Sequence, residues 1–172
     1  LAFGANLPVL PIDTLLAVAE EARAASKTPV TRVLAVMDAR MEQVYVAAYA
    51  FTPNTTDAAT ETNPLQGTWH CVQPPELHSP ESLHGPADWS QDSFIAAGNA
   101  WPVYAGRWPA ALTAPQRMAL PTAAALLRLA PAAWAAGEAV PPEEALPLYI
   151  RDKVAQTTDE RMQIKAQQAA AL

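Results

Sequence analysis

The stretch VLAVMDARMEQVYVAAYAF, residues 33–51, decides the fold more than any other part of this chain. It holds two apolar runs, residues 33–37 and 44–51, joined by a short polar link. Both runs are apolar on their two alternating faces, a pattern typical of strands that are covered on both sides. We therefore predict an antiparallel hairpin that is buried on both faces.

A helix is expected directly before this hairpin. Asp13 is a typical N-cap residue. Leucine, valine and alanine follow it at helical spacing, whereas Glu20, Glu21 and Arg23 are predicted to face away from the core.

Further elements are predicted after the hairpin. Residues 68–72 and 94–97 read as strands, the first of them at an edge of the sheet, and residues 146–150 as a last short strand. Residues 121–136 have a helical pattern that contains Pro131, and an interior proline costs about 3 kcal/mol, so we expect a kink or a break there. The predicted fold class is α/β: a mixed sheet with flanking helices, the hairpin first and crossover helices later.

Composition limits the classes of function. The chain has 172 residues, 51% of them hydrophobic, with a net charge of −6 and a pI near 4.9. Its 11 basic residues are scattered, which argues against tight direct binding of a nucleic-acid backbone. The single cysteine, Cys71, fits a reducing compartment, and no apolar stretch is long enough to span a bilayer.

The sequence offers weak candidates for chemistry. His70, Cys71, His78 and His84 are close in sequence, but their spacing and the prolines between them favour surface side chains over a zinc site. No serine lies in a Gly-x-Ser-x-Gly elbow, and no Gly-x-Gly is present to cradle a phosphate. We therefore predict no catalytic, cofactor-binding or metal-binding residue.

The polar link of the hairpin carries three charges within five residues. A solvated turn held by an ion pair explains such a link, and an exposed pair contributes under about 1 kcal/mol. We predict that Arg40 is held by Asp38 or Glu42 and helps to fix the hairpin tip, rather than acting on a substrate.

Several stretches together resemble one protein family. TRVLAVMDARMEQVY (residues 31–45), AGNAW (97–101) and LPLYIR (146–151) are similar, in this order, to motifs of the TsaB (YeaZ) family, which older naming placed among glycoprotease-like M22 peptidases. Residues 52–89 carry little of the resemblance. The residues that match the motifs are Asp38, Arg40, Tyr45, Gly98, Asn99, Trp101, Pro147, Tyr149 and Arg151.

The resemblance implies one lobe of an actin/Hsp70-like (ribonuclease H-like) fold. It also implies a cytoplasmic, non-catalytic subunit that partners TsaD, a threonylcarbamoyl transferase, in forming threonylcarbamoyladenosine at position 37 of tRNA. A TsaE-like ATPase belongs to the same pathway, tRNA would be reached only through the complex, and no membrane is involved. The hairpin tip lacks the glycine that nucleotide-binding members of the fold need there, which indicates a degenerate nucleotide site with no cofactor.

The resemblance also sets the expected domain limits. Residues 1–12 would be the end of a preceding N-terminal lobe, 13–151 the C-terminal α/β lobe, and 152–172 a tail that is either a short helix or disordered. The glycine-rich loop of the family's N-terminal lobe is not in this sequence, so we expect an incomplete chain that self-associates as a homodimer or belongs to a longer polypeptide. Two other functions stay open: an ATP-using or peptidase-like enzyme of the same superfamily, and a self-associating interaction domain.

Overall fold

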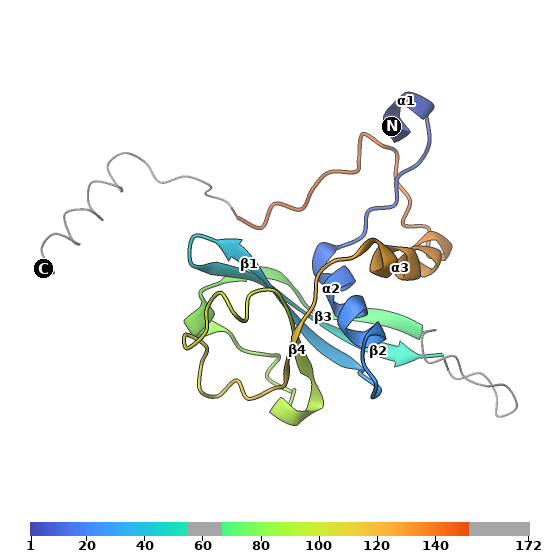
Figure 1. Ribbon diagram of the computed structural model, residues 1–172. Coiled ribbons are helices and arrows are strands. Elements are labelled where there is room, and N and C mark those ends of the chain that lie inside the picture. The colour runs from blue at the N-terminus through green and yellow to red at the C-terminus, as the bar shows by residue number, and fades with distance from the viewer. Residues whose placement is uncertain (55–66, 152–172) are drawn as a thin grey trace, which may run out of the picture.

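The computed structural model describes residues 1–54 and 67–151 (Figure 1). In chain order its elements are α1 (Ala2–Ala5), α2 (Thr14–Ala24), β1 (Arg32–Arg40), β2 (Gln43–Pro53), β3 (Gly67–His78), the 3-10 turns η1 (Pro80–Ser82) and η2 (Gln91–Ser93), β4 (Ile95–Gly98), β5 (Gln116–Met118) and α3 (Ala123–Ala135).

The predicted hairpin is confirmed. β1 and β2 pair in antiparallel register, with Val33 opposite Tyr49 and Val36 opposite Val46. The middle of each strand is buried on both faces. This burial explains why neither run shows the alternation of polar and apolar residues that a strand with one solvated face would need.

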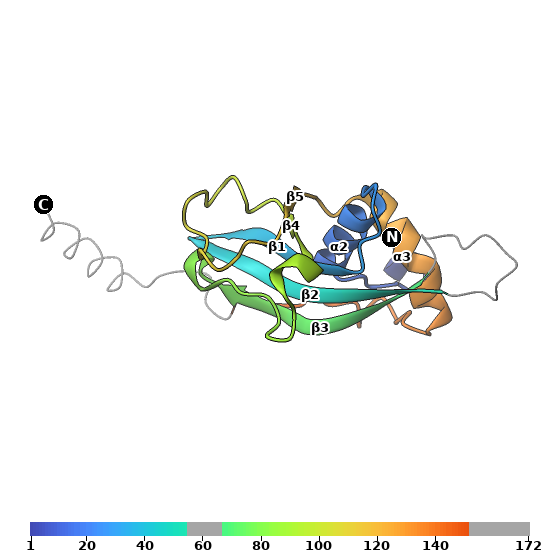
Figure 2. The ribbon, with the colours of Figure 1, turned by 90° about the horizontal axis from the view of Figure 1, so that it is seen from below.

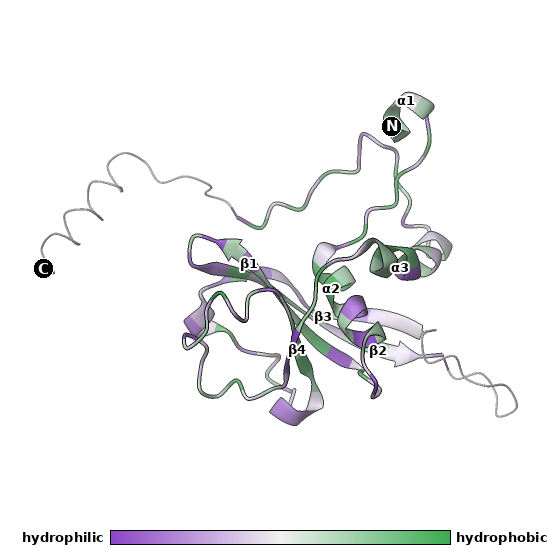
Figure 3. Ribbon diagram, viewed as in Figure 1, coloured by the Kyte–Doolittle hydropathy of each residue, from purple (hydrophilic) through white to green (hydrophobic). Residues whose placement is uncertain are grey.

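Each face of the hairpin has its own hydrophobic core. Val33 and Ala35 of β1 pack with residues of α2, whereas Leu34 and Val36 pack with apolar residues of the irregular segments 79–94 and 99–115. Figure 1 shows α2 and α3 on one side of the sheet and these segments on the other. Figure 3 colours much of α3 and of the middle of the sheet as hydrophobic. The sheet is therefore the central layer of three.

The described residues form a five-stranded sheet of order β3-β2-β1-β4-β5. β3 pairs antiparallel with β2 at one edge, while β4 runs parallel to β1 and β5 parallel to β4. Figure 2 shows the strands side by side with α2 and α3 at one end. The predicted mixed α/β class is confirmed, including an edge strand at residues 68–72 and a strand that ends at Gly98.

The connections into β4 and β5 differ from the prediction. Within the described residues, the connection into β4 contains the short 3-10 turns η1 and η2 where a crossover helix was predicted, whereas the helix predicted over residues 121–136 forms as α3. Trp89 and Trp101 instead anchor these irregular segments on the sheet. The short strand β5 was not predicted, because its sequence, Gln-Arg-Met, carries no apolar pattern.

Asp13 caps α2 as predicted, since its Oδ1 accepts the N–H of Leu16 at 3.0 Å. The same oxygen accepts the Tyr49 hydroxyl at 2.9 Å. Burial, followed by the charge of Asp13, raises the pKa of Tyr49, so this hydroxyl remains a donor at neutral pH. The cap therefore also joins the helix to β2.

The outward orientation predicted for Glu20 and Arg23 is wrong. Both are buried, with relative exposures of 2% and 7%. Arg23 Nε donates to Glu20 Oε2 at 2.9 Å, and Trp69 Nε1 and Arg128 Nε donate to the same carboxylate at 3.0 and 2.8 Å. A charge is tolerated at this depth because four donors from three elements satisfy it.

The break into two helices, one of the two outcomes expected at Pro131, does not occur in α3. The helix continues through Pro131 from Ala123 to Ala135. Pro131 removes the hydrogen bond to the carbonyl of Leu127, a residue that is 73% exposed, where water can replace the missing donor. Only Ala125 and Leu129 of this helix are buried.

The strand predicted over residues 146–150 does not form. This segment has no regular secondary structure, and Leu146 and Leu148 are 77% and 69% exposed. The segment pairs with neither edge strand of the described sheet, β3 or β5, and Pro147 has no N–H to donate to a ladder. Nearby, Val140 forms an isolated antiparallel bridge with Val9.

Some predictions fall outside the described residues. The tail predicted over residues 152–172 belongs to this group. Within the described part, no helix has the length and apolarity needed to cross a bilayer.

Candidate functional site

The tip of the β1–β2 hairpin has an unusual backbone. Arg40, Met41 and Glu42 all have positive φ angles, of 63°, 52° and 60°. The left-handed region costs an L-residue roughly 1–2 kcal/mol. Three such residues in succession therefore require support from elsewhere in the molecule.

Asp38 supplies the first support. Its Oδ1 accepts the backbone N–H of Arg40 and the hydroxyl of Tyr104, both at 2.8 Å. Its Oδ2 lies 3.5 Å from Arg40 Nη1, so the contact expected between these two residues is present. The Tyr104 hydroxyl also lies 3.2 Å from the carbonyl of Gln43, across the turn. Burial and the hydrogen bond to Asp38 raise the pKa of Tyr104, so its hydroxyl stays protonated as a donor.

The Gly98-Asn99 turn at the end of β4 supplies the second support. Asn99 Oδ1 accepts the N–H of Asp38 at 2.9 Å. Gly98 has a φ of +148°, and a Cβ built on it would lie 1.8 Å from the carbonyl oxygen of Val36. Only glycine lets β4 approach β1 this closely. Trp101 then packs on Trp108, with ring centroids 4.7 Å apart.

Arg151 supplies the third support from the far end of the lobe. Its Nη2 donates to the carbonyls of Ala39 and Arg40 at 2.9 and 3.2 Å, and its Nη1 lies 2.8 Å from the sulfur of Met41. In the part of the chain that the structure describes, its Nε is buried without a hydrogen-bond partner. Arg151, which belongs to the last motif of the sequence, therefore contacts the hairpin tip and supports its backbone.

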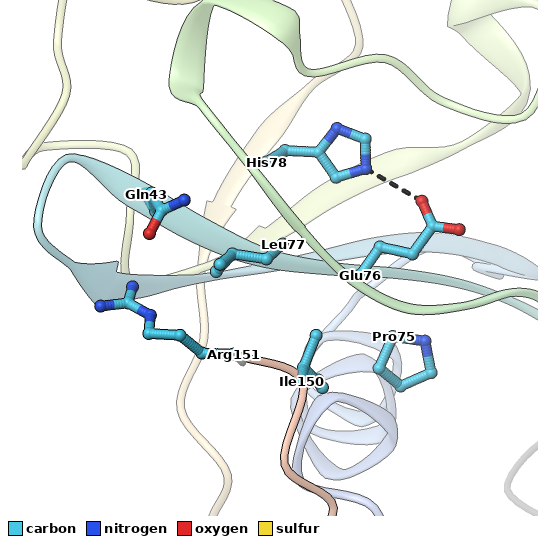
Figure 4. A pocket seen from close by; sticks show the side chains of 7 residues that line it. All are labelled: Gln43, Pro75, Glu76, Leu77, His78, Ile150 and Arg151. Carbon is cyan, nitrogen blue, oxygen red and sulfur yellow. Dashed lines mark hydrogen bonds and ion pairs between the residues drawn. The ribbon is translucent and has the colours of Figure 1, made fainter. Parts of the chain in front are cut away.

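Two cavities flank the segment that carries Arg151. One, of about 560 Å³, is lined by Gln43, Leu77, Ile150 and Arg151 among others, and Figure 4 shows the Arg151 side chain reaching toward the hairpin. The other, of about 790 Å³, is lined by Tyr45 and Pro147 together with residues of the α2 N-terminus.

Most of the nine motif residues therefore gather around the hairpin tip. Asp38, Arg40, Gly98, Asn99 and Arg151 belong to one network of hydrogen bonds and close backbone contacts. Trp101 lies buried beside this network, and Tyr45 and Pro147 line the larger cavity. Tyr149 is 83% exposed and lies apart from the network.

Two residues of the site were missed in the sequence. Tyr104 links the tip to the segment after β4, and Arg107 lies 3.7 Å from Glu42 and forms an ion pair with Glu81. The hydrogen bond to Glu81 raises the pKa of Arg107, which therefore stays charged. Both residues are more than 60 positions away from the hairpin in sequence, and no local pattern marks them.

The geometry indicates what this tip can do chemically. A phosphate cradle presents free backbone N–H groups and usually glycine. Here the N–H of Arg40 is donated to Asp38, and the three tip residues all carry side chains. The arrangement is that of a firmly supported turn.

The histidine and cysteine candidates lie on or next to β3. The rings of His78 and His84 are in edge contact, with centroids 5.7 Å apart, and Cys71 is exposed. Among the described residues, no group of three or more His, Cys, Asp or Glu side chains is placed to hold a metal ion.

Comparisons with known proteins agree on one family. The model of the TsaD family, described as tRNA N6-adenosine threonylcarbamoyltransferase, matches residues 1–158. The TsaB protein of Escherichia coli K12, a tRNA threonylcarbamoyladenosine biosynthesis protein, is 31% identical over 157 residues, which are 90% of this chain and 62% of the relative. The TsaB protein of Haemophilus influenzae is 29% identical over 90% of this chain and 61% of its own length.

Solved structures give the same result. YeaZ from Pseudomonas aeruginosa has a TM-score of 0.69 and 34% identity, covering 86% of this chain and 62% of that one. A second P. aeruginosa structure, described as similar to the peptidase YeaZ, has a TM-score of 0.70 and 33% identity, covering 87% of this chain and 62% of that one. The fold is thus that of the actin-like YeaZ proteins, although the chain spans about three fifths of the length of the relatives it matches. The chain belongs to the TsaD family, and the relatives that it resembles are TsaB (YeaZ) proteins.

Proposed function

We propose that this chain acts as a non-catalytic scaffold subunit that partners a TsaD-like threonylcarbamoyl transferase in forming threonylcarbamoyladenosine at position 37 of tRNA. The names of the curated relatives, which are tRNA threonylcarbamoyladenosine biosynthesis proteins, support this assignment. Residues 13–151 would form the lobe that carries the motif residues, and these residues would have a structural role.

The observation that carries the non-catalytic part of the proposal is the hairpin tip. In an actin-like lobe this turn is where a nucleotide phosphate would be held. Here Arg40, Met41 and Glu42 place side chains at the turn, and the carbonyls of Ala39 and Arg40 accept hydrogen bonds from Arg151. A nucleotide would have to displace this network, so the tip is suited to support and contact rather than to phosphate binding.

The net charge of the chain supports the proposal that it reaches tRNA only through a partner. A net charge of −6 disfavours direct contact with the tRNA backbone, so tRNA would be reached through the catalytic subunit. A TsaE-like ATPase would join the same complex, which we place in the cytoplasm. Formation of a homodimer is a second proposal, supported by exposed apolar side chains such as Leu127 and Trp134, at 73% and 60%.

Reconstitution tests the proposal. The purified chain alone should hydrolyse neither ATP nor peptide substrates above background. Modification of tRNA should require the catalytic subunit. An ATPase or peptidase activity that follows the chain through purification, and disappears when one side chain is replaced, would establish an enzyme instead.

A further inference from the structure

Helix α3 buries little apolar surface. Only Ala125 and Leu129 of this helix are buried, and the small cluster that they form with Ala17 of α2 is separate from the two main cores. The helix packs mainly against α2 and has few contacts with the strands, and Figures 1 and 2 show the two helices side by side. Apolar packing therefore holds α3 less firmly than it holds β1 or β2.

The C-terminal half of α3 borders a cavity. This cavity has a volume of about 390 Å³, and residues of α3, α2, β2 and β3 line it, among them Ala132, Ala133, Leu16 and Trp69. A side chain that faces a void has no atoms to contact on that side. Pro131 also removes one hydrogen bond from the helix interior. This half of the helix therefore depends on support from elsewhere.

Three hydrogen bonds from α3 and its N-cap residue reach two carboxylates of α2. Arg128 Nε donates to Glu20 Oε1 at 2.8 Å, and Arg128 Nη2 donates to Glu21 Oε2 at 2.7 Å. The hydroxyl of Thr122, the N-cap residue, donates to the same oxygen of Glu21 at 2.7 Å. We call these four residues the polar clasp. The Arg128 side chain is 31% exposed, so water and salt reach the clasp.

The rest of the lobe keeps its support when the polar clasp is broken. Glu20 still accepts two hydrogen bonds from Arg23 and one from the indole N–H of Trp69. The two main cores, which hold α2 and the strands together, contain no residue of α3. Segments with few buried apolar contacts open at a lower free energy than the core of a protein does. α3 has the properties of such a segment.

We infer that α3 is a lid: it detaches from α2 as one unit when the polar clasp breaks, while the sheet stays folded. Opening of this lid exposes the residues of α2 and β3 that line the cavity, including Leu16 and Trp69. Salt favours the open form, because it screens the partly exposed charges of the clasp. The inference does not depend on the proposed function, since it concerns the chain by itself.

Hydrogen exchange of the whole chain, followed by mass spectrometry, tests the lid. Wild type is compared with R128M and with the control R117M, whose arginine is half-buried on β5 and has no ion pair among the described residues. In wild type, the amides of residues 127–135 should exchange at least about tenfold faster than those of β1 and β2. R128M should speed this exchange by about another tenfold, because it removes two hydrogen bonds to carboxylates, and should leave β1 and β2 within about twofold. R117M should match wild type in both regions.

A salt series separates the polar clasp from apolar packing. Raising NaCl from about 0.05 M to about 1 M should speed exchange of α3 about threefold in wild type and should have little effect in R128M. Equal exchange of α3 and β1 in wild type would overturn the inference, because α3 would then open only with global unfolding. The inference also fails if R128M leaves the exchange of α3 unchanged, or raises that of β1 by the same factor. Should R128M not fold, the wild-type salt series decides: exchange of α3 that does not rise with salt, or rises equally in the sheet, contradicts the lid.

Discussion

Replacing Gly98 with alanine tests the support of the hairpin tip most sharply. Gly98 has a φ of +148°, and an added Cβ would lie 1.8 Å from the carbonyl oxygen and 2.6 Å from the carbonyl carbon of Val36. Both atoms belong to the backbone of β1, in the middle of the core. No flexible side chain can move aside, so β4 must shift away from β1.

The magnitude follows from two contributions. An alanine at this φ costs about 1–3 kcal/mol in backbone strain. Separating the strands to an ordinary contact of 3.4 Å requires a shift of about 1.6 Å, and overpacking of this kind costs typically 1–3 kcal/mol. We expect G98A to lose about 3–5 kcal/mol of the free energy of unfolding, and to weaken the Asn99 hydrogen bond that follows it.

Urea denaturation of G98A and of the control G106A provides the assay. Gly106 also has a positive φ, of +81°, but a Cβ added there meets no atom within 4 Å. G106A should therefore lose only the share of the unfolding free energy that comes from backbone strain, about 1–2 kcal/mol. Equal losses in the two variants would refute the argument, because the close approach of β4 to Val36 would then contribute nothing.

Three further predictions concern charged residues. E20A should lose about 3–5 kcal/mol of the free energy of unfolding in urea denaturation, because the donors of Arg23, Trp69 and Arg128 would lose the buried carboxylate that they share; a loss below 1 kcal/mol would contradict this. R40A should lose at most about 1 kcal/mol in the same assay, since the side chain is 87% exposed, and a loss above 2 kcal/mol would show that the tip depends on it. The hydrogen bond from Thr122, followed by that from Arg128, lowers the pKa of Glu21 from its ordinary value of 4.5. This carboxylate therefore stabilises the fold fully above about pH 4.5 and progressively less as pH falls through its lowered pKa, so E21Q should lose stability at pH 7 and show a weaker acid dependence in urea midpoints measured between pH 7 and pH 3.

The sequence predicts those parts of the fold whose own residues show a clear hydrophobic or capping pattern. The hairpin follows from two runs that are apolar on both faces, and the start of α2 follows from Asp13. The strand over residues 94–97 was predicted, but the reason for the glycine after it, Gly98, is a long-range contact with Val36 that no local pattern reveals. Elements with mixed or short sequences, such as β5, are missed for the same lack of local signal.

The errors share a physical cause, which is tertiary context. Glu20 looks like a solvent-facing residue of an amphipathic helix, yet Trp69 and Arg128 from other elements make its burial favourable. Pro131 looks like a helix breaker, yet the carbonyl that it leaves unpaired belongs to the exposed residue Leu127. Residues 146–150 look like a strand, but they pair with neither edge strand of the described sheet, and Pro147 lacks the N–H that a ladder needs.

The candidate site was predictable only as a set of motif residues. Asp38, Gly98 and Arg151 are far apart in sequence, and the resemblance to a family identified them without saying what they do. The structure places all three around the hairpin tip, and it adds Tyr104 and Arg107 to the candidate site. Which of these residues contact one another depends on how the chain folds, and not on the residues next to them in sequence.

Native mass spectrometry of the chain, co-expressed with a TsaD-like catalytic subunit from the same organism, tests the central proposal most directly. A scaffold subunit should appear as a heteromeric complex whose mass is the sum of the two chains. Spectra that contain only the separate chains, or only a homodimer of this chain, at concentrations where both proteins are folded, would contradict the proposed role.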